Sequence, residues 1–321
     1  MSTHLTMRGR GLLLAISATC MIPTGAVSAE VSGGAGAPSV AGGPNAAISM
    51  AGAGKSQRVR YGKRLAIRGF VSPREAGRPV KLEHAIRGRS FRTVAATKTG
   101  ADGSYRFRVK ARRSRSYRAT TTASPSGAAT TTAARKVTVV ARLVGRSRRH
   151  LLGGRALAVT GKLVPRVSRR AVRLQVRTRR GWKTVDRTRT RARGRFKASF
   201  RPQRAGVYRL RVRFPGDSAA AGASDRLKRV YVYRSGHASW YGPGLYGNST
   251  SCGGALTAAR LGVAHKYLPC GTRVTFRYRG RSVTAPVIDR GPFAAGREWD
   301  LTAATKRRLG FGDVGVVWST R

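Results

Sequence analysis

The chain has 321 residues, which exceeds the usual single domain and predicts two or three domains. It carries 65 lysine and arginine residues against 11 aspartate and glutamate residues, a formal net charge of +54. No apolar run in it is long enough for a membrane span, which argues against an integral membrane protein.

The charge is concentrated in the middle of the chain. Residues 55–234 hold 51 basic and 6 acidic residues, whereas residues 235–321 hold 12 and 4. Such a field attracts polyanions, so anionic cell-wall polymers of the teichoic-acid type are candidate partners, and anionic membrane surfaces are another. A coding bias towards arginine would give the same composition without any binding role.

The N-terminus has the order of a secretory signal. Arg8 and Arg10 precede an apolar stretch from Leu12 to Ile22, and small residues follow up to Ala29. This predicts a signal peptide over residues 1–29, cleavage near Ala29, and a secreted or cell-wall location. Residues 30–54 are Gly, Ala, Ser and Val with almost no charge, which predicts a flexible linker.

A repeat with an offset of 91 or 92 residues follows the linker. Residues 65–73 correspond to residues 157–165, and residues 91–94 correspond to residues 182–185. Within each copy, apolar and basic residues alternate, which is typical of antiparallel strands with one solvent-facing side. Repeats of this length resemble bacterial immunoglobulin-like sandwiches, although the Cys–Trp–Cys core of true immunoglobulin domains is missing. We therefore expect two such sandwiches, at residues 55–140 and 141–234.

The last region, residues 235–321, delivers a carboxylate to the end of a strand. A run of β-branched residues from Val283 to Ile288 is followed by Asp289 and then by a Gly-Pro turn, which is a normal strand signal. An acid at such an exit is well placed in a groove, because loops carry function while the sheet holds them. A turn cap, or an ion pair with Arg290, is the alternative role for this aspartate.

Two cysteines, Cys252 and Cys270, lie in the same region. An even pair in an exported domain predicts a disulfide bond. Closing a loop of about 18 residues would stabilise the fold by roughly 3 kcal/mol. These two thiols with His265 do not make a zinc set, and we expect neither a metal nor a cofactor.

Four ordered motifs in residues 236–319 carry a family resemblance. They are His-Ala-Ser-Trp-Tyr-Gly from residue 237, Ala-His-Lys from residue 264, Asp-Arg-Gly-Pro from residue 289, and Asp-Leu-Thr from residue 300 before a helix-like run. In this order they resemble the RlpA-like (rare lipoprotein A) double-psi β-barrel family, whose septal-ring members are lytic transglycosylases. The resemblance implies a mainly β chain, with a six-stranded double-psi β-barrel after the two sandwiches.

The resemblance also implies a reaction. Lytic transglycosylases cleave the MurNAc–GlcNAc bond of peptidoglycan and leave a 1,6-anhydro sugar. One carboxyl group can protonate the glycosidic oxygen and then accept the proton of the attacking 6-hydroxyl. Asp289 matches the catalytic aspartate of the family, and Asp300 is the second catalytic candidate. Members with this activity commonly carry a glutamate at the position of Gly254, eleven residues before His265.

Expansins, whose related barrel loosens walls without hydrolysis, bind glycan through aromatic residues. By this analogy, and from the family motifs, the predicted substrate-binding residues are Trp240, Tyr241, Tyr246, His265, Arg290, Phe293 and Trp299. Packing in the barrel is the alternative role for each aromatic residue, and a hydrogen-bonding role for His265. For Asp300 the alternative is the N-cap of the following helix.

Three functions are therefore open. The first is an exported lytic transglycosylase on peptidoglycan strands, with Asp289 as acid and base and the sandwiches as wall tethers. The second is a non-catalytic, expansin-like protein that binds glycan or loosens the wall. The third is a basic cell-wall adhesin that binds anionic polymers in a salt-sensitive way. No specific nucleic-acid partner is expected.

Overall fold

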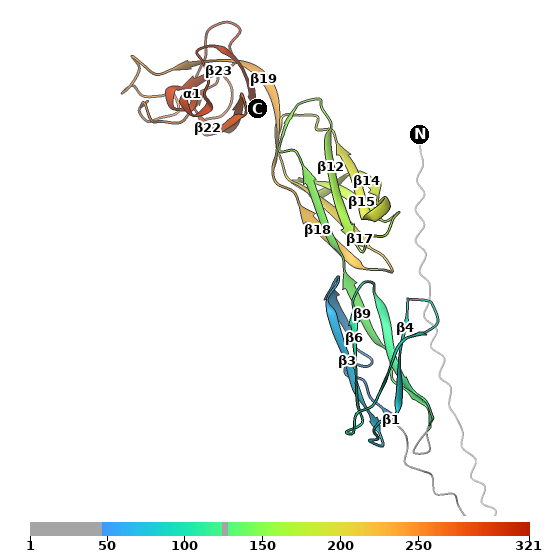
Figure 1. The fold of residues 1–321 in the computed structure, drawn as a ribbon. Helices are drawn as coiled ribbons and strands as arrows, with labels where there is room; N and C mark the ends of the chain where they lie inside the picture. Colours follow the sequence, from blue (N-terminus) through green and yellow to red (C-terminus); the bar gives the residue numbers. More distant parts are fainter. Residues whose placement is uncertain (1–46, 124–127) are drawn as a thin grey trace, which may run out of the picture. The chain divides into compact units, whose positions relative to one another are not determined.

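The computed structural model describes residues 47–123 and 128–321, and these residues are mainly β-strand (Figure 1). The predicted signal peptide at residues 1–29 lies outside the described residues, as does most of the predicted linker at residues 30–54. Among the described residues, no helix has the length and apolar character needed to cross a membrane.

The first sandwich consists of two sheets. In one sheet β3 (Arg64–Ser72) lies between β1 (Ala47–Ile48) and β6 (Ser104–Lys110). The strands of the other sheet, in spatial order, are β9 (Arg135–Val140), β7 (Arg115–Thr121), β4 (Pro79–Ala85) and β5 (Arg92–Lys98), with β2 (Ser56–Arg60) paired to β9 and β8 (Thr130–Thr131) paired to β7.

Strict alternation explains why these residues form a sandwich. In β3 every second residue is buried, including Ile67 and Val71, while the residues between them face solvent. Period-2 alternation of this kind puts one face of a strand against a core. Residues 47–54, which the sequence assigned to the linker, belong to this sandwich: β1 pairs with β3, and Met50 is buried in the core.

The second sandwich repeats this plan. One sheet is β10 (Arg142–Ser147), β12 (Leu157–Val164) and β15 (Arg195–Phe200), the last preceded by the 3₁₀ turn η1 (Ala192–Gly194). The other sheet is β14 (Gly181–Arg189), β13 (Ala171–Thr178), β17 (Leu210–Gly216) and β18 (Ala221–Arg226). β11 (His150–Leu152) and β16 (Gly206–Tyr208) pair with the first part of β19 (Val230–Tyr241).

Fine details agree between the two sandwiches. The β4–β5 pairing has a β-bulge opposite Leu82 and Glu83, where Val94 is the extra residue in β5, and the β13–β14 pairing has one opposite Leu174 and Gln175, where Val185 is the extra residue in β14. Because a bulge is a designed feature of a strand rather than a defect, its recurrence at an offset of 91 residues supports the repeat found in the sequence.

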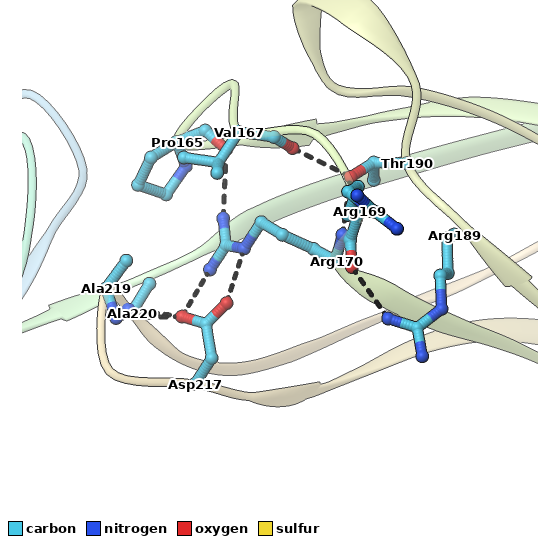
Figure 2. A network of polar contacts seen from close by, with 9 residues as sticks. All are labelled: Pro165, Val167, Arg169, Arg170, Arg189, Thr190, Asp217, Ala219 and Ala220. Carbon is cyan, nitrogen blue, oxygen red and sulfur yellow. Dashed lines mark hydrogen bonds and ion pairs between the residues drawn. The ribbon is translucent and has the colours of Figure 1, made fainter.

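A buried arginine, Arg170, ties the second sandwich together (Figure 2). Its guanidinium donates from Nε and Nη2 to the two carboxylate oxygens of Asp217, at 2.7 and 2.9 Å, and from Nη1 to the carbonyl oxygen of Pro165 at 2.9 Å. The same group lies 4.3 Å from the centre of the Phe214 ring. Only 4% of Arg170 is exposed, so this fork-to-fork ion pair is largely shielded from water.

The C-terminal part is a closed barrel of six strands. They follow the order β19, β23 (Trp299–Thr302), β20 (Val263–Ala264), β22 (Arg281–Asp289), β21 (Arg273–Tyr278) and β24 (Gly315–Ser319), and β24 pairs back onto β19. Two pairs are parallel, β19 with β23 and β20 with β22. This arrangement confirms the six-stranded double-psi β-barrel expected from the sequence.

One short helix, α1 (Ala303–Leu309), closes an end of the barrel. The side chain of Thr302 caps its N-terminus by accepting from the N–H of Thr305, and Gly310 ends it with a positive φ of 65°. A left-handed glycine is the usual helix C-cap. The capping role considered for Asp300 therefore belongs to Thr302.

Candidate functional site

Four neighbouring strands of the barrel place four residues at one level. Asp289 in β22 and Asp300 in β23 are both register partners of Ala264 in β20, and Ser239 in β19 is the partner of Asp300. Register partners lie side by side on neighbouring strands, which are roughly 4.8 Å apart, and the β20–β22 pairing shifts register between Val263 and Ala264. The two aspartates therefore lie on either side of one small, buried alanine.

Asp289 is surrounded by hydrogen-bond donors on one side. Its Oδ1 accepts from the N–H of Ser251 at 2.9 Å, from the hydroxyl of Ser251 at 2.7 Å and from the N–H of Arg290 at 2.9 Å. Three donors on one oxygen stabilise a negative charge there. The side chain is partly exposed, so the carboxylate can be reached from solvent.

Asp300 has a different environment. Burial raises the pKa of its carboxyl, and the negative charge of Asp289 acts in the same direction, while the Ser239 hydroxyl and the charge of Arg297 oppose the rise. Within the described residues, Oδ1 of Asp300 is buried without a hydrogen-bond partner, as are Ser239 Oγ and Tyr241 Oη. A buried carboxyl of this kind retains its proton to a higher pH than an exposed carboxyl does.

Tyr241 lies two residues after Ser239 in β19 and so faces the same side of the strand. Burial raises the pKa of its phenol, and the charges of Asp289 and Asp300 raise it further. The hydroxyl therefore stays protonated and is available as a donor beside the two carboxyl groups.

Three loops converge beside Asp289 and are fastened to one another. The disulfide between Cys252 and Cys270, predicted from the sequence, is present. The guanidinium of Arg290 donates to the carbonyl oxygens of His265 and Leu268, at 3.4 and 3.1 Å. Arg290 therefore braces the loop after β20, while only its backbone N–H contacts Asp289.

His265 has a positioning role in the same loop. Its Nδ1 accepts from the N–H groups of Tyr267 and Leu268, both at 3.0 Å, which assigns the ring proton to Nε2. Burial lowers the pKa of His265, and the charges of Arg234 and Arg290 lower it further, so the ring is neutral near pH 7. This geometry matches the hydrogen-bonding alternative considered for His265.

The predicted aromatic residues fall into two groups. Trp299 is completely buried in the barrel core and offers no face to a sugar. Trp240 is half-buried, donates from Nε1 to Asp313 at 2.7 Å, and has the Lys306 ammonium 3.6 Å from its ring centre. By contrast, Phe293 is 82% exposed and Tyr246 is 41% exposed.

Gly254, the position where the family commonly has a glutamate, adopts a φ of +76°. A side chain there would be strained by the left-handed backbone and would begin 3.2 Å from Nη1 of Arg260. Arg260 donates to the carbonyl oxygens of Gly253, Gly254 and Ala255, at 2.8, 2.7 and 2.8 Å. An arginine thus holds this loop in a shape that favours glycine.

Three residues of the site were not singled out in the sequence. Ser239 lies two residues before Tyr241 in the same strand, so the alternation of a strand could have placed both side chains on one face. Ser251 reaches Asp289 across 38 positions of sequence, which no local pattern reveals. Tyr267 is 87% exposed beside His265 and was missed because it lies in a loop.

Metal binding has no support in the geometry of the described residues. Among residues 47–123 and 128–321, no group of three or more His, Cys, Asp or Glu side chains is close enough to hold an ion. The carboxyl pair with its serine and tyrosine neighbours is suited instead to moving protons.

Comparisons with known proteins match the barrel. The family described as lytic transglycolase matches residues 233–318. The probable endolytic peptidoglycan transglycosylase RlpA of Synechocystis sp. is 43% identical over 96 residues, which are 29% of this chain and 29% of that protein. The endolytic peptidoglycan transglycosylase RlpA of Campylobacter jejuni is 48% identical over 76 residues, 23% of this chain and 28% of that protein.

The RlpA of Pseudomonas aeruginosa is 40% identical over 83 residues, 25% of this chain and 24% of that protein. The chain thus spans less than a third of the length of each of these three relatives, and the matched part is the barrel. With its two parallel strand pairs and its closed order of six strands, the domain at residues 233–318 belongs to the RlpA-like double-psi β-barrel family.

Proposed function

We propose that this protein is an exported lytic transglycosylase that cleaves the MurNAc–GlcNAc linkages of peptidoglycan. The observation that carries the proposal is the pair of carboxyl groups flanking Ala264, one that accepts three hydrogen bonds on a single oxygen and one whose pKa burial raises. Pairs of carboxyls with divergent environments are the usual basis of glycosidic acid and base catalysis. The peptidoglycan-acting names of the relatives support the substrate.

The sequence suggested one residue, Asp289, for both proton transfers, and the environments favour a division of roles. Asp300 donates its proton to the glycosidic oxygen as the bond from the anomeric carbon breaks. Asp289 accepts the proton of the sugar's 6-hydroxyl as that oxygen attacks the anomeric carbon, which gives the 1,6-anhydro product without water. The Tyr241 hydroxyl stays protonated beside both carboxyl groups, and it donates a hydrogen bond to the glycosidic oxygen, on which negative charge develops as the bond breaks.

Exposed aromatic rings near the carboxylates supply a glycan contact. Phe293 follows β22 four residues after Asp289, and Tyr267 lies in the loop that Arg290 braces. A large exposed ring on a fixed loop suits stacking on a sugar face. We assign the substrate-binding role to these two residues and to Tyr246, and structural roles to Trp299, Trp240, His265 and Arg290.

The test is digestion of purified peptidoglycan sacculi followed by mass analysis of the soluble fragments. We expect 1,6-anhydro muropeptides from the unmodified protein and a loss of roughly a hundredfold or more for Asp289→Asn and for Asp300→Asn, the usual size of a general acid or base contribution. Asp102→Asn, in an exposed turn of the first sandwich, is the matched control. Unchanged product yield in both barrel variants would refute the assignment.

Gly254 favours a second candidate function. Without the family's glutamate, and with Arg260 holding the loop, the barrel has one carboxylate fewer than its catalytic relatives are expected to have. An expansin-like protein would bind sacculi through the same exposed aromatic rings and release nothing. Binding that persists without anhydro products, and that falls in Phe293→Ala and Tyr267→Ala, would favour this alternative over the first.

The export signal and the wall location belong to the same proposal. The substrate lies outside the cytoplasm, and the order of charges and apolar residues at the N-terminus is that of a secretory signal. Detection of the chain in the extracytoplasmic fraction, beginning near residue 30, would agree. A full-length chain in the cytoplasm would contradict it.

A further inference from the structure

The two sandwiches carry the same three-residue arrangement on the solvent-facing side of one sheet. In the first sandwich, Arg118 of β7 donates from Nε to Glu83 of β4 at 2.6 Å and lies 4.1 Å from the ring centre of Phe91. In the second sandwich, Arg211 of β17 donates from Nε to Gln175 of β13 at 2.8 Å and lies 4.3 Å from the ring centre of Trp182.

The difference between the two arrangements is one charge. Glu83 and Gln175 occupy equivalent positions, each directly after the register shift that the bulge of the neighbouring strand causes. The glutamate neutralises Arg118, whereas the glutamine positions Arg211 through the same Nε bond and leaves its charge uncompensated. In the second repeat, the guanidinium of Arg211 is therefore held in place and stacked on the Trp182 indole. Its two other nitrogen atoms do not bind Gln175.

Further arginines surround Arg211 on the same face. Arg226 of β18 is its register partner, and Arg213 of β17 is the register partner of Arg173 in β13. Like charges directly opposite one another destabilise a sheet. The pKa of Arg211 is lowered, first by burial and then by the charges of Arg213, Arg226 and Arg177.

The carboxylates of this sandwich do not offset the charge. Residues 141–234 contain three acidic residues, and each has another partner. Asp217 binds Arg170, Asp186 accepts from the N–H of Ser199, and Asp225 accepts from the N–H of Gly145. The positive face is thus maintained against a cost in stability, which is typical of a site whose counter-charge comes from a ligand.

A hollow lies beside the stacked indole. It has a volume of about 540 Å³ and is lined by Arg177, Trp182, Arg209, Arg226 and Arg229, together with two leucines. These arginines come from two strands, β13 and β18, and from the two segments that precede β17 and follow β18. A tetrahedral phosphate, with oxygens pointing several ways, fits such an arrangement better than a planar carboxylate, which one guanidinium fork satisfies.

We propose that this face of the second sandwich, formed by Arg173, Arg177, Arg211, Arg213, Arg226 and Trp182, is a binding site for the phosphate groups of an anionic phosphodiester polymer. The site is separate from the carboxyl pair of the barrel and does not depend on the reaction proposed there. It would hold the protein on a phosphate-bearing wall polymer while the barrel acts on glycan.

The test uses the full chain and inorganic polyphosphate as the probe, with affinity measured by calorimetry at several salt concentrations. Gln175→Glu recreates the neutralised pair of the first sandwich, so the fold should tolerate it. We expect it to weaken polyphosphate binding roughly tenfold, the size of a lost charge-assisted contact, and to make the salt dependence shallower. Gln203→Glu, the same change in an exposed loop of the same sandwich, is the control and should leave affinity within about twofold of the unmodified protein.

Two results would overturn the proposal. If Gln175→Glu and Gln203→Glu bind polyphosphate equally well, the charge acts diffusely and no site exists at Arg211. If polyglutamate of matched length binds as tightly as polyphosphate and is equally sensitive to Gln175→Glu, the site recognises carboxylates and the phosphate assignment is wrong. Thermal melting of both variants distinguishes lost binding from lost folding.

Discussion

Replacing Arg170 by methionine tests how much the shielded ion pair of Figure 2 contributes to the second sandwich. Methionine keeps most of the side-chain volume, so the change removes mainly the polar contacts. After the substitution, Asp217 still accepts from the N–H groups of Ala219 and Ala220, at 2.8 and 3.1 Å, and its side chain is 36% exposed. The remaining carboxylate is therefore hydrated and is not stranded.

The expected cost follows from the separate contacts. The carbonyl oxygen of Pro165 loses a buried donor, which costs about 1 kcal/mol. The ion pair, whose carboxylate is partly exposed, contributes about 1 kcal/mol, and the stacking on Phe214 about another 1 kcal/mol. Arg170→Met should therefore destabilise the second sandwich by about 3 kcal/mol. Asp217→Ala should cost more, about 3–5 kcal/mol, because it leaves a guanidinium buried without a counter-charge.

Hydrogen exchange followed by mass spectrometry measures this locally, since a chain of several domains does not unfold in two states. Peptides from residues 157–226 should exchange faster in both variants, and peptides from residues 64–121 serve as the internal control. The pKa of Asp217 is lowered: burial is the largest single influence and raises it, but the hydrogen bonds from Arg170, Ala219 and Ala220 and the charge of Arg170 together outweigh burial. Its contribution is present above the unfolded pKa of about 4 and is lost as pH falls through the folded value. Equal protection in Arg170→Met and the unmodified protein at pH 7 would refute this reasoning.

Three further predictions concern the barrel. The pKa of Asp300 is raised by burial, so the stabilising effect of this carboxyl is complete below about pH 4 and is lost as pH rises through the folded pKa. Asp300→Asn should therefore melt at a higher temperature than the unmodified protein at pH 7. A lower melting temperature of the variant at pH 7 would contradict the burial argument. Replacing Cys252 and Cys270 together by serine should cost about 3 kcal/mol in denaturant unfolding monitored by barrel fluorescence, and no loss would mean that the loop is held by its other contacts. Ser251→Ala removes the hydroxyl donor at 2.7 Å from Asp289, the proposed base, and should lower kcat roughly tenfold with little change in KM, whereas a pure KM effect would make it a substrate contact.

The strands of the barrel and the place of Asp289 could be predicted because they depend on short-range patterns. β-branched runs ended by glycine and proline mark strands, and Asp289 stands at the end of one of them. The disulfide followed from counting cysteines in a chain with a predicted export signal. The repeat was visible because two copies of one fold preserve the spacing of their turns.

The remaining features depend on contacts between distant positions. Nothing near Trp299 in the sequence distinguishes a ring on the surface from one that packs on Phe276, 5.0 Å away between ring centres. Arg290 follows Asp289 directly, yet its guanidinium turns to the loop after β20. The charge difference between Glu83 and Gln175 was readable in the aligned repeats, but its meaning appears only with the arginine and aromatic ring that each one meets.

The alanine between the two carboxyl groups has a consequence for how this domain can change over evolutionary time. The interval between Asp289 and Asp300 is set by three adjacent backbones, with Ala264 in the middle one. Loops around the barrel can lengthen, shorten or exchange their aromatic residues without altering that interval. New preferences for one glycan over another can therefore arise through substitutions in these loops, while the spacing of the two carboxyl groups in the proposed site stays the same.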